Sequence, residues 1–75
     1  MRFFIAYKDT DYMDFHEEPW IAPSETGFSD IESARLEAKQ MKKVDSYNDV
    51  TLFAAESVPE TITWEFVERH KIQEI

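Results

Sequence analysis

The chain has 75 residues, 43% of them hydrophobic, and a formal net charge of −8 at pH 7, which together fit one small domain with a packed core. It has no cysteine, which excludes disulfides and cysteine-based zinc sites and favours a cytoplasmic location. The negative charge repels phosphates and argues against direct binding to nucleic acid or to an anionic membrane. No apolar run approaches the roughly 18 residues of a membrane span.

The first predicted element is a strand over Arg2–Lys8, which is rich in aromatic and β-branched residues. Both of its alternating sets are apolar: Phe3, Ile5 and Tyr7 on one side, Phe4 and Ala6 on the other. This pattern indicates a central strand that is covered on both faces.

A long connection, Asp9–Gly27, follows this strand. Pro19 and Pro23 interrupt regular pairing within it. A connection of this length is unusual in a small domain. It therefore predicts either a functional loop or an irregular edge strand.

The next element is predicted to be a helix from Ser29 to Lys43. Ser29 and Glu32 have the spacing of a capping box, and lysines in the last turn complement the helix dipole. One apolar stripe has helical spacing: Ile31, Ala34, Ala38 and Met41. Leu36 falls on the opposite side of this helix.

A second strand is predicted over Val50–Ala55. Residues 61–67 alternate with a period of two, which favours a third strand. The alternative is a second helix, because Ser57 and Glu60 also have capping-box spacing.

We therefore expect an α+β domain with the order β-α-β-β, in which one helix packs on a small three-stranded mixed or antiparallel sheet. The last two strands should pair antiparallel. The first two, joined through the helix, should be parallel if they are adjacent.

Carboxylates are concentrated early in the chain, where the stretch from Asp9 to Glu32 has no Lys or Arg. The candidate acidic surface comprises Asp9, Asp11, Asp14, Glu17, Glu18 and Glu25. Their spacing does not match a calcium-binding EF-hand loop, so we predict solvated charge and no metal site.

Catalytic residues are not predicted. His16 stands beside two glutamates, but neighbours on a loop do not form the convergent, buried cluster that acid–base chemistry needs. Ser29 and Ser57 are interpreted as helix caps. The chain is therefore expected to be non-enzymatic and to need no cofactor.

Large apolar residues accompany the acidic stretch and suggest a contact surface, since Trp and Tyr are frequent in interface hot spots. The candidate partner-binding residues are Tyr12, Phe15, Trp20, Ile21 and Leu36. For Trp20 the competing interpretation is that it covers the small core.

The sequence thus predicts a protein-binding or adaptor module that contacts a protein partner through residues 12–21. A homodimer is an alternative arrangement, because unpaired sheet edges gain stability when covered. A second hypothesis is an acidic inhibitor encoded by a phage or mobile element, which imitates nucleic-acid charge and blocks a basic DNA- or RNA-binding protein. A third, a metal-dependent enzyme, has the least support.

Overall fold

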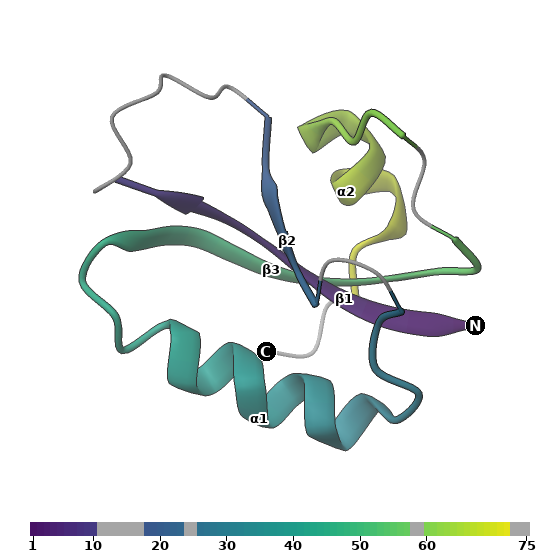
Figure 1. Cartoon of the computed structure of the whole chain (residues 1–75), viewed down its shortest axis with the longest axis horizontal. Coiled ribbons are helices and arrows are strands. Elements are labelled where there is room, and N and C mark those ends of the chain that lie inside the picture. Colours follow the sequence, from purple (N-terminus) through teal and green to yellow (C-terminus); the bar gives the residue numbers. More distant parts are fainter. Residues whose placement is uncertain (11–17, 24–25, 58–59, 73–75) are drawn as a thin grey trace.

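The computed structural model describes residues 1–10, 18–23, 26–57 and 60–72. The elements in chain order are β1 (Arg2–Asp9), β2 (Trp20–Ala22), α1 (Ile31–Met41), β3 (Tyr47–Ala55) and α2 (Trp64–His70). The strands form one antiparallel sheet in the order β2-β1-β3. The two helices lie on opposite faces of this sheet (Figure 1). The expected α+β fold is confirmed, and the C-terminal segment takes the alternative form of a second helix.

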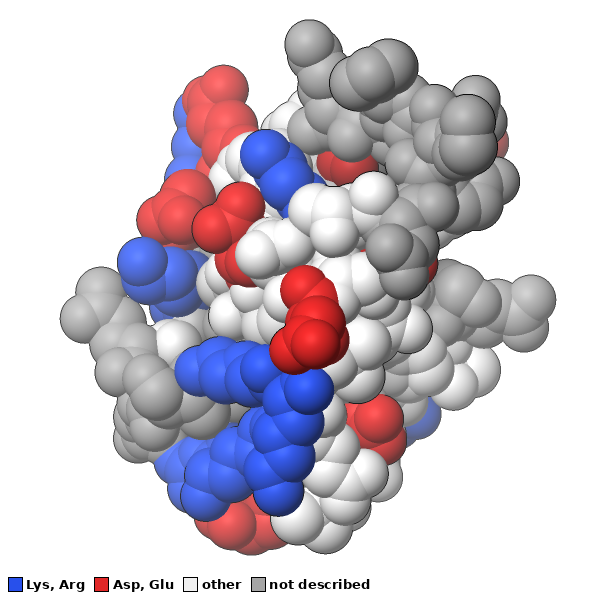
Figure 2. Space-filling model, turned by 90° about the vertical axis from the view of Figure 1, so that its left-hand side faces the viewer, with Lys and Arg blue, Asp and Glu red and all other residues white. Residues whose placement is uncertain are grey.

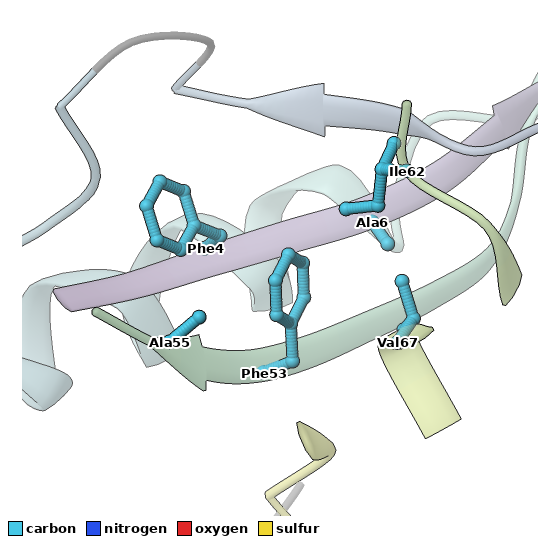
Figure 3. Close-up of a cluster of buried hydrophobic side chains, with 6 residues drawn as sticks. All are labelled: Phe4, Ala6, Phe53, Ala55, Ile62 and Val67. Atoms are coloured by element: carbon cyan, nitrogen blue, oxygen red, sulfur yellow. The ribbon is translucent and has the colours of Figure 1, made fainter. Parts of the chain in front are cut away.

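Strand β1 is the centre of the molecule, as its two apolar sides predict. Phe4 and Ala6 point toward α2 and Ile5 points toward α1, and all three are buried. On the α2 side, Phe4 stacks on Phe53 of β3 with ring centroids 5.5 Å apart. Val67 of α2 belongs to the same cluster (Figure 3). Each face of the sheet thus has its own small core.

Helix α1 begins one residue later than the expected capping box would place it. Phe28 exchanges backbone hydrogen bonds of 2.7 and 2.9 Å with Phe3, which holds the chain extended just before the helix. Asp30 is the N-cap, and its carboxylate accepts hydrogen bonds from Ser33 N at 3.0 Å and Ser33 Oγ at 2.9 Å. The prediction that Ser29 is the cap was wrong.

The apolar stripe of α1 packs on the sheet as predicted. Ala34, Ala38 and Met41 are buried against Ile5 and Leu52, since alanine side chains let the helix backbone approach closely. Ile31 is partly buried at the edge of this cluster. Leu36 is 60% exposed, which confirms that it lies on the outer side of the helix.

Strand pairing differs from the expectation because the connection after β1 contains β2. Strand β2 reverses the chain direction before α1 begins, so α1 joins two strands that flank β1 on opposite edges. Strand β3 therefore pairs antiparallel with β1, and the predicted parallel pairing was wrong. Its register shifts near Asp49, where one extra residue is accommodated with a positive φ of 55°.

The prediction of a strand over 61–67 was also wrong, because this segment leads into α2. Thr63 has extended backbone angles and its hydroxyl accepts a hydrogen bond from Phe66 N at 3.2 Å, so Thr63, and not Ser57, is the N-cap. After α2 the chain returns to the sheet, where Ile72 N donates to Leu52 O at 2.9 Å. The sheet edge at β3 is thereby partly covered.

The only glycine of the chain lies against the central strand. Gly27 has a φ of 70°, and a Cβ at this position would lie 2.8 Å from the Phe4 ring. Arg2 also contacts this turn, because its Nε donates a hydrogen bond to Thr26 O at 2.7 Å. Close approach and positive φ together require glycine here.

Neither helix in the described part of the chain has the length and the apolar run that crossing a bilayer requires.

The effect of a leucine-to-alanine substitution on stability should differ between the core and the surface. Leu52 is fully buried, so Leu52→Ala is expected to lower the free energy of unfolding by about 2–5 kcal/mol. The matched control is Leu36→Ala on the exposed side of α1, which should change it by less than about 0.5 kcal/mol. Urea denaturation followed by circular dichroism measures both, and equal effects would contradict this core.

The start of α2 can be tested at two threonines. Thr63→Ala removes the capping hydroxyl and is expected to cost about 1 kcal/mol of stability. Thr61, two residues earlier, is exposed and caps no helix, so Thr61→Ala should cost much less. Thermal unfolding of the two variants provides the comparison, and a larger loss for Thr61→Ala would rule out this cap.

Candidate functional site

The predicted contact and acidic residues are only partly within the described structure. Those outside the described residues are Asp11, Tyr12, Asp14, Phe15, His16, Glu17 and Glu25. Trp20 and Ile21 form most of β2, while Leu36 lies on the outer side of α1. Ile21 packs against the cluster on the α2 face, so the structure does not bring Leu36 and Ile21 together.

Strand β2 is an edge of the sheet. Phe3 exchanges both of its backbone hydrogen bonds with Phe28, on the β2 side of β1. Backbone groups alternate in direction along a strand, so the N–H and C=O of Ile5 and Tyr7 also point to that side. Ile21 stands opposite Ala6, at the position between these bonded pairs. Its N–H and C=O therefore point away from β1, and no hydrogen bond from the described residues satisfies them. This edge can accept another strand.

Three large aromatic residues cross the sheet at one end, and we call them the aromatic row: Trp20 of β2, Tyr7 of β1 and Tyr47 of β3. Trp20 and Tyr7 are directly paired, and directly paired residues share one face of a sheet. The Tyr7 and Tyr47 rings are 4.7 Å apart between centroids. All three side chains are partly exposed. Tyr7 and Tyr47 pack against the cluster on the α1 face, which includes Met41 at the C-terminal end of that helix.

Tyr7 is the ionisable member of the row with a perturbed environment. Burial raises the pKa of its phenol above the ordinary value of 10.0, and negative charge on Tyr47 and Asp9 raises it further. The phenol consequently stays neutral at physiological pH. A neutral phenol can both donate and accept a hydrogen bond.

A second surface feature, which the sequence analysis assigned only to the helix dipole, is the lysine patch. It consists of Lys39, Lys42 and Lys43, at and just beyond the C-terminal end of α1. Figure 2 faces the end of the molecule that carries the turn between α1 and β3, and Lys and Arg side chains are gathered there. The spacing of i, i+3 and i+4 in the sequence was the available sign that they share one side.

Two other polar side chains in the described structure, His70 and Lys8, lie against aromatic rings. The exposed His70 ring stacks on Phe66 with centroids 4.2 Å apart, and its Nδ1 lies 2.8 Å from Phe66 O. Lys8 lies 3.9 Å from an Asp49 carboxylate oxygen and over the Trp64 ring. Among the described residues, no three His, Asp or Glu side chains are grouped to hold a metal ion.

Comparison of the chain with protein-family models, with curated proteins and with solved structures found no match.

The raised pKa of Tyr7 predicts a pH dependence of stability. A phenol that holds its proton more tightly in the folded chain contributes stability below pH 10.0, and this is lost as the pH rises through the folded-state pKa. Tyr7→Phe should reduce the loss of stability above pH 10.0. The Tyr47→Phe variant should still lose most of this stability above pH 10.0, because burial is the main cause of the raised pKa of Tyr7. Urea denaturation measured at a series of pH values between about 8 and 11, a range that includes the ordinary pKa of tyrosine, gives this dependence.

Proposed function

We propose that this chain is a non-enzymatic protein-binding module of the cytoplasm that contacts a protein partner through the segment 12–21 and the edge strand at its end. The observation that carries the proposal is the outward-facing backbone of Ile21, next to the aromatic row. An edge strand with free N–H and C=O groups can pair with an extended segment of another chain.

The composition of this surface supports a protein ligand. Trp and Tyr give large contact areas at low entropic cost and are enriched in interface hot spots. Trp20 is partly exposed and belongs to the same three-residue strand as Ile21. Backbone pairing would supply affinity, while the aromatic side chains would supply selectivity for the partner.

Two copies of the chain could also pair through β2, which makes a homodimer one form of the same proposal. Charge imitation of nucleic acid has less support. The lysine patch interrupts the acidic character of one end of the molecule, where an imitator of phosphate would carry carboxylates.

The test blocks the outward N–H of Ile21 without altering a side chain. A chemically synthesised chain with an N-methyl group on Ile21 should lose its partner, because methylation prevents strand addition and leaves the pairs between β1 and β2 intact. N-methylation of Thr61, an exposed residue outside the strands and helices, is the control. Quantitative pulldown from lysate and light scattering report hetero- and homotypic partners.

A second variant tests the aromatic contribution. Trp20→Ala should weaken partner binding by about 30-fold, which corresponds to a hot spot of about 2 kcal/mol. Leu36→Ala is the control, since Leu36 is exposed on the outer side of α1. Retention of the same partners by the wild type, the Ile21-methylated chain and Trp20→Ala would refute binding at this edge.

A further inference from the structure

The lysine patch differs from the other basic side chains of the described structure in having neither a carboxylate partner nor a side-chain hydrogen bond there. Lys8, Arg35, Arg69 and Lys71 each form an ion pair with an acidic residue. Arg2 donates to backbone carbonyls. Lys39, Lys42 and Lys43 are exposed, and none of them has an ion pair or a side-chain hydrogen bond with the described residues.

The helix dipole explains why lysines are stable at this end of α1, but it leaves their ammonium groups available. Asp45 is the next carboxylate along the chain and forms no ion pair with them. Three positive charges without a carboxylate partner among the described residues are therefore gathered at the C-terminal end of α1, in a chain whose net charge is −8.

An apolar surface adjoins the lysine patch. Val44 is 41% exposed and immediately follows Lys43. The turn is closed by Tyr47 N, which donates to Val44 O at 3.0 Å, so the backbone of Val44 lies beside that of Tyr47, one member of the aromatic row. A ligand at this end would meet ammonium groups on one side and apolar and aromatic side chains on the other.

We propose that the lysine patch, with Val44 and Tyr47, binds an acidic segment of the partner protein in which carboxylates flank an apolar side chain. This inference rests on the proposed protein-binding function and specifies the chemistry of the partner. Exposed ion pairs contribute at most about 1 kcal/mol each, so three of them need an apolar anchor to give measurable affinity. Val44 and Tyr47 provide that anchor.

The charge distribution favours a short acidic peptide over a nucleic acid. The chain carries −8 in total, of which the patch contributes +3, so the remainder carries −11. Phosphates beyond the patch would meet this negative remainder, whereas a few carboxylates fit within the patch. Screening over about 8–10 Å at physiological salt keeps the attraction local.

The probe is a synthetic peptide with one phenylalanine between two pairs of glutamates, titrated into the ¹⁵N-labelled chain and followed by NMR. We expect shifted amides to cluster within residues 39–47, and the dissociation constant to rise as salt increases from about 50 to about 500 mM. The triple variant Lys39→Gln, Lys42→Gln, Lys43→Gln should weaken binding by about tenfold, or about 0.5 kcal/mol per lost pair.

A triple variant with the same change in net charge is the matched control. Arg2→Gln, Arg69→Gln and Lys71→Gln remove three charges away from residues 39–47, Arg2 being at the opposite end of β1, and should leave the dissociation constant within about twofold, since screening makes the effect of distant charges small. Equal weakening by both triple variants would overturn the inference. So would the absence of shifts in residues 39–47, or tighter binding of a short DNA duplex at the same lysines.

The outcome is separable from that of the proposed function. If methylation of Ile21 abolishes partner capture while the peptide leaves residues 39–47 unperturbed, the lysine patch is not a binding site and the edge-strand function stands. If the peptide binds at the patch while the Ile21 and Trp20 variants keep every partner, the edge strand is not the contact.

Discussion

The structure depends on one strand whose two faces must both be kept from water. Phe4 and Ala6 on one face of β1, and Ile5 on the other, are almost completely buried. A single helix can cover only one of these faces, so the fold needs a helix on each side. The three strands and two helices are therefore a consequence of placing an apolar strand in the centre of a short chain.

This arrangement limits where a function can be located. The two small cores use most of the large apolar side chains, and buried polar or charged residues are absent from the described part of the chain. Among the described residues, the edge at β2 has outward-facing backbone groups, and the aromatic row has partly exposed side chains. Both are surfaces that suit another polypeptide better than a small substrate that must be enclosed.

The basic side chains fall into those that form ion pairs with nearby acids and those that do not. Three of the basic side chains form ion pairs with acids three or four residues away in their own helix or just beyond its end. Such pairs add a few tenths of a kcal/mol each to a short helix. Lys39, Lys42 and Lys43 take no part in these pairs, so three positive side chains without an ion pair among the described residues lie at the C-terminal end of α1.

The residue pattern predicted correctly those elements whose apolar residues fit only one period, helical or extended. The apolar stripe of α1 has helical spacing, and the two apolar sides of β1 have strand spacing. It could not decide residues 61–67, because Ile62 and Phe66 satisfy both an alternating pattern and an i, i+4 pattern. Tertiary packing decides for the helix there, because Phe4 and Ala6 on the α2 face of β1 are buried only when α2 packs against them. Tertiary structure also determines β2. A strand of three residues has too short a pattern to be predicted, and it forms because its backbone hydrogen-bonds to β1.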